Sequence, residues 1–172
     1  MKLLKSRKAL STVVTTLIIL VVSVLLATVV TFYAINVTTT RVQEESLQIT
    51  NLHVWCTDSG VASAAFVITN TGGRDAVIDK ITVRGVESAG TNIYYKSVSS
   101  PSDPSWADDP SDLTGYTQVG NDALVLPSGN RIIVYLFNLN HLSTSDIGVT
   151  VGVVVFTANA QYHKEANVEA AA

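Results

Sequence analysis

Residues 10–35 read LSTVVTTLIILVVSVLLATVVTFYAI, and this stretch decides how the rest of the chain is organised. It contains no charged residue, no proline and no glycine. As an α-helix it would be about 39 Å long at ~1.5 Å per residue, whereas about 20 apolar residues already span the hydrocarbon core of a bilayer. Apolar side chains fall on every side of such a helix, which predicts burial in lipid or against other protein.

The charges on either side of this stretch predict its orientation. Four of the eleven basic residues precede it with no acidic residue among them: Lys2, Lys5, Arg7 and Lys8. After it come Arg41, Glu44 and Glu45, so the positive-inside rule places the N-terminus in the cytoplasm and residues 45–172 outside. The apolar run is far longer than the ~7–15 residues of a cleaved secretory signal. We therefore expect a single-pass membrane precursor.

The junction Ser6-Arg7-Lys8-Ala9-Leu10-Ser11 joins basic residues to the apolar helix through one small residue. It resembles the class III signal peptide of archaeal type IV pilin and archaellin precursors, and the resemblance covers residues 5–45. That resemblance implies a prepilin peptidase that cuts between Ala9 and Leu10, removing residues 1–9. It also implies that residues 10–36 lie in the membrane before assembly and then form a filament core with copies of the same chain. Bacterial pilins usually carry Glu at the position of Val14 and often a helix proline, and this chain has neither.

Small residues mark one face of the predicted helix. Ser23, Ala27 and Thr31 are spaced by four residues, with Thr12 and Thr16 as a shorter stripe. Such stripes let helix backbones approach closely, although small residues are also common in any membrane helix.

Asn36-Val37-Thr38 is the only glycosylation sequon. On a surface filament Asn36 would carry a glycan. Its closeness to the bilayer or to the helix bundle favours an unused sequon.

The remainder of the chain predicts an all-β domain. Residues 37–46 are polar and should continue the helix as a stalk, after which apolar residues alternate with a period of two. Six or more short strands separated by turn residues indicate an immunoglobulin-like antiparallel sandwich over residues 47–160, with an ambiguous tail at 161–172. The expected strands are 47–55, 61–69, 77–84 as the hairpin partner of 61–69, 92–98, 131–139 as a central strand, and 147–155.

One aspartate and two glycines within the expected strands carry further predictions. Asp79 falls on the expected inner face of its strand, where a carboxylate is unfavourable. Gly148 and Gly152 lie opposite a face formed by five β-branched residues, which suggests close approach of another layer.

The longest irregular stretch is 99–120, and it is predicted to be a surface loop. It contains three prolines and four aspartates, Asp103, Asp108, Asp109 and Asp112, which are weak candidates for calcium ligands. Their spacing does not match an EF-hand, so a solvated loop is the favoured interpretation. Trp106, Tyr116, Tyr94 and Tyr95 are candidates for an exposed aromatic contact patch or for core positions.

Catalytic and cofactor motifs are missing from the sequence. His53, His141 and His163 are scattered, and Cys56 is the single cysteine and should be a buried apolar side chain. No nucleophile elbow, phosphate-binding loop or dinucleotide fingerprint occurs. From residue 10 onward the chain has seven basic and fourteen acidic residues, and this net negative charge argues against nucleic-acid binding. We expect no enzyme and no cofactor.

Two functional hypotheses follow. The first is a structural subunit of an archaeal type IV pilus-like filament with a role in attachment or surface interaction, its external ligand unknown. The alternative is a permanently membrane-anchored extracytoplasmic β-sandwich binding module, including a minor pilin or an envelope-layer binder. The basic-Ala-Leu-Ser junction and the chargeless helix favour the filament, because an anchor requires neither.

Overall fold

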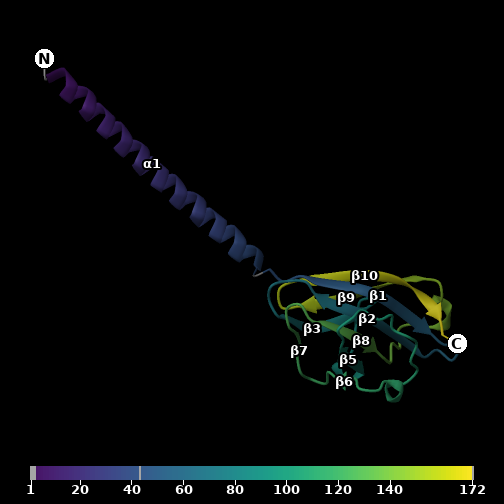
Figure 1. Cartoon of the computed structure of the whole chain (residues 1–172). Helices are drawn as coiled ribbons and strands as arrows, with labels where there is room; N and C mark the ends of the chain where they lie inside the picture. The colour runs from purple at the N-terminus through teal and green to yellow at the C-terminus, as the bar shows by residue number, and fades with distance from the viewer. Residues whose placement is uncertain (1–2, 43, 172) are drawn as a thin grey trace. The chain divides into compact units, whose positions relative to one another are not determined.

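The computed structural model describes residues 3–42 and 44–171, with side chains from 10–39 and 44–171. The chain divides into two units, one ending at Val42 and the other beginning at Gln43. The first is the helix α1, Leu3–Val42, and the second is an all-β domain (Figure 1). The strands are β1 Leu47–Cys56, β2 Ala62–Asn70, β3 Ala76–Val83, β4 Val86–Glu87, β5 Ile93–Ser97, β6 Thr117–Gln118, β7 Leu124–Leu126, β8 Arg131–Leu136, β9 Thr150–Thr157 and β10 Gln161–Ala170. The expected class, a long apolar helix followed by an all-β domain, is confirmed.

The ten strands form one curled sheet. Its order is β4-β3-β9-β10-β1-β2-β8-β5-β6, with β7 also paired to β3. All neighbours are antiparallel except β1 and β10, which run side by side in the same direction over Val54–Cys56 and Val168–Ala170 (Figure 1). This parallel pair joins two halves, so the domain is a single curled sheet rather than two separate antiparallel ones.

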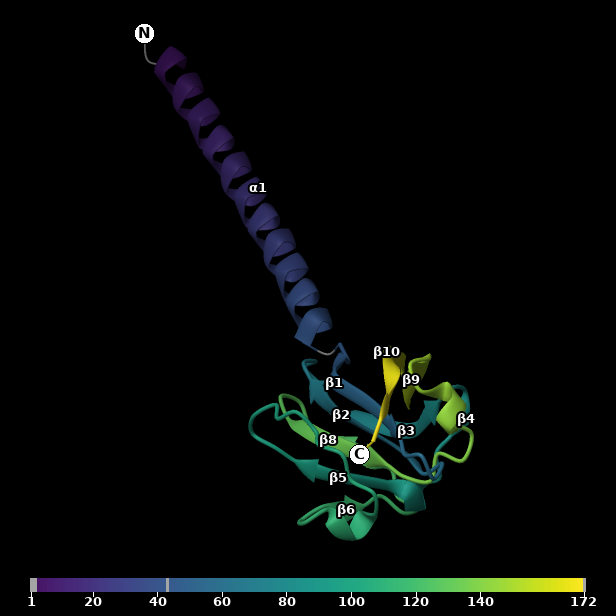
Figure 2. The ribbon, with the colours of Figure 1, turned by 90° about the vertical axis from the view of Figure 1, so that its right-hand side faces the viewer.

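The main core lies between the two halves of the curled sheet. In Figure 2 the strands β5, β8 and β2 form one side of the domain, and β9, β3 and β4 form the other. Phe66 and Val134 come from the first half and Ile81 and Val153 from the second, and each is at most 1% exposed. Burying each of these side chains contributes about 1.5–3 kcal/mol, so this shared core holds the curl closed.

The predicted stalk is shorter than expected. The helix continues through Val42, but Glu44 to Ser46 have no regular secondary structure. Their carbonyl groups instead accept hydrogen bonds from the turn after β2: Thr71 N donates to Ser46 O at 2.9 Å, and Gly73 N to Glu44 O at 3.1 Å. Because this turn takes carbonyls that a helix would use internally, the helical expectation for 44–46 was wrong.

The strands β2 and β3 are not a hairpin, which corrects another expectation. β2 pairs with β1 and β8, whereas β3 pairs with β9, β7 and β4 in the other half. The buried side chain of Asn70 stabilises this crossing. Its Nδ2 donates to Arg74 O at 2.7 Å and to Leu126 O at 2.9 Å, and its Oδ1 accepts from Gly72 N at 3.0 Å. Asn70 therefore replaces the ladder bonds that a hairpin would supply.

A β-bulge explains why Asp79 is not buried. The register between β3 and β9 shifts between Ile78 and Lys80, so the inward face changes from Ala76 and Ile78 to Ile81 and Val83. Asp79 lies at the shift and is exposed. One extra residue at a bulge reverses which side chains face the core.

The strand β9 is shorter at its start than the alternation suggested. Val151, Val153 and Val155 face the core, but Ile147 and Val149 precede the strand and are exposed. Gly148 has φ +85° and open space around it, so it serves a turn. Gly152 does have a close neighbour, the side chain of His163 on the adjacent strand β10, rather than another layer. The idea of a packed layer at both glycines was therefore wrong.

The C-terminal tail is a full strand. β10 pairs with β9 over seven residues and with β1 over three, and Val168 is 2% exposed in the main core. The sequence does not show a clear apolar–polar alternation in β10, because the charged residue Lys164 lies opposite the buried residue Val153. The central position of β8 is confirmed, since it lies between β2 and β5 and is buried on both faces.

Candidate functional site

Many polar side chains of the helix α1 donate hydrogen bonds to its own backbone. Thr15, Ser23, Thr28, Thr31, Thr38 and Thr39 each donate a hydroxyl hydrogen bond to the carbonyl four residues earlier, at 2.7–2.9 Å. Asn36 Nδ2 likewise donates to Phe32 O at 3.0 Å. These bonds use the hydroxyl hydrogens and one Asn36 amide hydrogen without water, which suits a helix in lipid or in a dry helix bundle.

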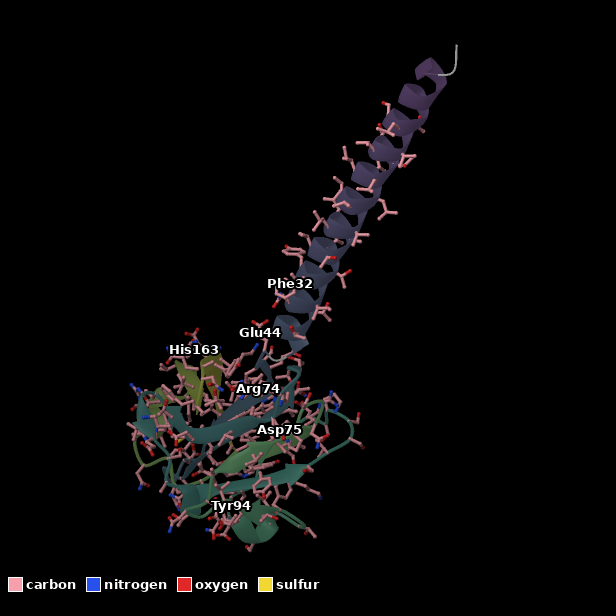
Figure 3. The ribbon with its side chains drawn as sticks, turned by 90° about the vertical axis from the view of Figure 1, so that its left-hand side faces the viewer. Phe32, Glu44, Arg74, Asp75, Tyr94 and His163 are labelled. Carbon is pink, nitrogen blue, oxygen red and sulfur yellow. The ribbon has the colours of Figure 1, made fainter. Side chains whose placement is uncertain are left out.

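The apolar surface of α1 is unusually complete. The segment Leu10–Thr39 has a mean hydropathy of 2.9 and is long and apolar enough to cross a membrane. Its large side chains project on every side (Figure 3), and Phe32 and Tyr33 are 70% and 71% exposed. Soluble monomers rarely leave such a large continuous apolar surface in water, so this helix requires lipid or other protein around it.

Small residues hollow one part of this surface. Val24, Ala27, Thr28, Thr31, Phe32 and Ile35 line a shallow, mostly apolar hollow of about 460 Å³. Ala27 and Thr31 belong to the predicted small-residue stripe, and the Thr31 hydroxyl donates a hydrogen bond to the Ala27 carbonyl. A bulky side chain from a neighbouring helix fits this kind of hollow, as in knobs-into-holes packing.

The predicted processing junction lies partly outside the residues whose side chains are described. The backbone is helical from Leu3 onward, so the Ala9–Leu10 bond lies within α1. Side chains of Arg7, Lys8 and Ala9 fall outside the described set, whereas Leu10 is 68% exposed and Ser11 is also exposed. The sequon residue Asn36 is on the exposed surface of the same helix.

The long loop is not simply solvated. Residues 99–116 cover the outer face of β1, β2, β8 and β5, where a second hydrophobic cluster lies. We call it the outer aromatic cluster: Trp55, Ala65, Val67, Ala107, Ile133, Tyr135 and Phe137. Tyr94, Trp106 and Tyr116 pack against it, while Tyr95 packs against the main core. Most of the aromatic residues considered for a contact patch therefore serve this cluster (Tyr94 is labelled in Figure 3).

Several hydrogen bonds attach the loop to the strands beneath it, among them Lys96 Nζ to Thr114 O at 3.2 Å. Tyr135 Oη donates to Ser105 O at 2.9 Å, and Ser63 Oγ donates to Ala107 O at 3.3 Å. Arg131 Nη1 donates to Ser99 O at 3.3 Å. Trp106 meets Trp55 edge to face with ring centres 6.0 Å apart.

The four loop aspartates do not converge. Asp109 and Asp112 cap the short 3₁₀ turn Pro110–Asp112, and hydrogen bonds from Ser111 lower the pKa of Asp109. Asp108 is exposed, and Asp103 lies against His53. Across residues 3–42 and 44–171 no group of three or more His, Cys, Asp or Glu side chains could hold a metal ion.

His53 links three segments of the β-domain. Its Nδ1 lies 3.0 Å from Glu169 Oε1 on β10, and its Nε2 lies 3.1 Å from Asp103 Oδ1 in the loop. The ring also stacks on Trp55, with centres 5.4 Å apart and planes 8° apart. Burial alone lowers the pKa of His53, but the hydrogen bonds to Glu169 and Asp103 outweigh burial and raise it above 6.5. The sequence carries no signal for these partners, because they lie 50 and 116 residues away along the chain.

The other two histidines and the cysteine have separate surroundings. His163 is exposed, and its Nε2 lies 3.7 Å from Glu165 Oε1. Burial lowers the pKa of His141. Cys56 is fully buried, as expected, and burial raises the pKa of its thiol.

In comparisons with known proteins, no family model matches this chain and no curated protein matches it significantly.

Proposed function

We propose that this chain is a structural subunit of an archaeal type IV pilus-like surface filament with a role in attachment or another surface interaction. The observation that carries the proposal is α1, whose Leu10–Thr39 segment is apolar on all sides and turns most of its Ser and Thr hydroxyl groups to its own backbone. The resemblance of the junction before Leu10 to an archaeal prepilin processing site adds to it.

The physical logic proceeds in three steps. The basic residues before Leu10 hold the N-terminus at the cytoplasmic face, because moving each through lipid costs about 2.5–3.5 kcal/mol or more. Hydrolysis of the Ala9–Leu10 peptide bond by a prepilin peptidase removes these charges. The remaining helix then leaves the bilayer and packs against copies of itself, using hollows such as the one around Ala27 and Thr31.

The β-domain suits the outside of such a filament. Among the residues with described side chains, 10–39 and 44–171, the buried members of its main core all lie between Leu47 and Val168 and none comes from α1. Its role is structural or adhesive rather than catalytic. The alternative function, a permanently anchored binding module, uses the same fold but leaves residues 1–9 attached.

N-terminal sequencing with intact mass measurement separates these functions. The native protein is taken in parallel from sheared surface material and from membranes. A chain that begins at Leu10 and is enriched in the sheared fraction supports processing and assembly. A chain that retains residues 1–9 and occurs only in membranes refutes the filament and leaves the anchored module.

A further inference from the structure

A β-bulge in β1 brings His53 to the outer face of the sheet. The pairing of β1 with β2 shifts between Thr50 and His53, and Asn51 within the shift has φ +49°. Asn is among the few residues that adopt this left-handed conformation readily. After the bulge Val54 and Cys56 face the main core, and His53 and Trp55 face the outer aromatic cluster.

The geometry around His53 selects its protonated form. Both ring nitrogens lie within 3.1 Å of a carboxylate oxygen, and an ionised carboxylate only accepts hydrogen bonds. A neutral imidazole has one N–H, so it can donate to only one of the two carboxylates and turns a lone pair toward the other. The imidazolium donates to both, and its positive charge also favours the stacked indole of Trp55.

No other described charge competes with these two carboxylates. On the neighbouring strand β2, the residue opposite His53 is Ala65, and on its own strand the ring stacks on Trp55. Glu169 from β10 and Asp103 from the loop are the charged groups that act electrostatically on the ring.

We propose that residues 99–107 form a pH-dependent strap over the outer aromatic cluster. Protonated His53 holds the strap in place by donating one hydrogen bond to Asp103 in the strap and another to Glu169 on β10. When His53 loses its proton, one contact is lost. Asp103 is the more exposed partner, with 70% of its side chain accessible against 49% for Glu169, so Asp103 moves into solvent. The strap then loosens around Pro104, which is buried in the closed form, and around Trp106.

The direction of the effect follows from linkage. A pKa raised in the closed form means that closing binds a proton more tightly. The stabilisation of the closed strap is therefore complete below pH ~6.5 and is lost as the pH rises through the pKa of His53. The surface around Trp55 and Trp106 becomes accessible above the pKa of His53 and stays covered below it.

The test uses the full chain in detergent micelles between pH 5 and pH 9. Three readouts are followed together: the NMR titration of the His53 ring, tryptophan fluorescence, and hydrogen-exchange protection of residues 99–107 corrected for intrinsic rates. Trp55 and Trp106 are the chain's only tryptophans, so fluorescence reports this region alone. We expect a His53 midpoint above 6.5 and a matching loss of strap protection, about ten-fold for each pH unit by which the midpoint exceeds 6.5.

Variants separate the strap from general stability. His53→Gln should abolish the pH-dependent change in both fluorescence and strap exchange. Asp103→Asn removes an exposed carboxylate with little risk to folding, and should make the exchange protection of the strap equal at both ends of the pH range and lower than in the parent at acidic pH. His163→Gln is the matched control and should keep the transition. A His53 midpoint at or below 6.5, or strap protection that does not change through that midpoint, would overturn the proposal.

Discussion

His141 is the residue at which acid should weaken the fold. Its Nε2 is buried without a hydrogen-bond partner in the described part of the chain. Burial lowers the pKa of the ring, and together with the nearby Arg84 charge it outweighs a backbone hydrogen bond with Val83 that raises the pKa. The folded chain thus binds this proton less readily than the unfolded chain. Its contribution to stability is complete above pH ~6.5 and is lost as the pH falls below that value.

His141→Gln should therefore reduce the acid sensitivity of the domain. The free energy of unfolding, measured by guanidinium denaturation of the full chain in micelles, should fall less between pH 7 and pH 5 in the variant than in the parent. His53→Gln should have the opposite sign, because the pKa of His53 is raised. Equal slopes in the parent and the His141 variant would contradict this assignment.

Gly72 is required for a close backbone approach. A Cβ at this position would lie 2.5 Å from Glu44 O and 2.6 Å from Ser46 N, both backbone atoms that cannot move aside cheaply. Gly72→Ala should destabilise the domain by about 2 kcal/mol or more, measured as a shift of the denaturation midpoint.

The matched control is Gly152→Ala. Its Cβ would lie 2.6 Å from His163 Nε2, which is the far end of an exposed side chain that can rotate away. This substitution should cost less than ~1 kcal/mol. A similar cost at both positions would mean that Gly72 is not constrained by backbone packing.

At the scale of elements, β10 should behave as an integral strand. Val168 and Asn167 are neighbours on opposite faces of β10, the first in the main core and the second exposed. Val168→Asp places a carboxylate in the core and should cost at least about 3 kcal/mol or prevent folding. Asn167→Asp keeps the acceptor that Thr150 uses and should change stability by less than ~0.5 kcal/mol. Near-UV circular dichroism and guanidinium denaturation measure both effects, and equal tolerance would show that β10 is dispensable.

The helix α1 should tolerate added bulk unevenly. Ala27→Leu fills the hollow lined by Val24 and Phe32, so neighbouring helices could no longer approach there. We expect membrane insertion to be unchanged and the amount of the chain in sheared filaments to fall about ten-fold or more, equivalent to ~1.4 kcal/mol of packing. Val29→Leu enlarges a 66% exposed position two residues away and serves as the control. Equal filament yields from both variants would exclude close packing at this stripe.

The sequence predicts the elements better than their connections. The length and apolarity of residues 10–35 identified α1. Periodicity identified most long strands, because burial on one face leaves a visible pattern. It missed the crossing at Asn70 and the β-bulges at Asn51 and Asp79, because each depends on contacts that only the folded chain makes.

The candidate sites divide in the same way. Apolarity of residues 10–36 and the Arg7-Lys8-Ala9 junction are local signals, so they can be read from sequence. The His53 contacts join residues 50 and 116 positions apart, and the loop aspartates looked like one cluster because they are close only in sequence. Their separate roles in capping and ion pairing emerge from the fold.

The whole molecule combines a β-domain with its own hydrophobic core and a helix long and apolar enough to cross a membrane. The β-domain buries its own core between two halves of one sheet. The apolar surface of Leu10–Thr39 is not buried by other parts of the described chain. In the proposed function, lipid covers it before assembly and copies of the same helix cover it in the filament.

Cryo-electron microscopy of filaments sheared from cells tests whether the helix forms a filament core. We expect helical filaments in which residues 10–36 of many copies pack against one another at the centre and the β-domains lie outside. Sheared material without this chain, together with a chain found only in membranes and still carrying residues 1–9, would contradict this expectation.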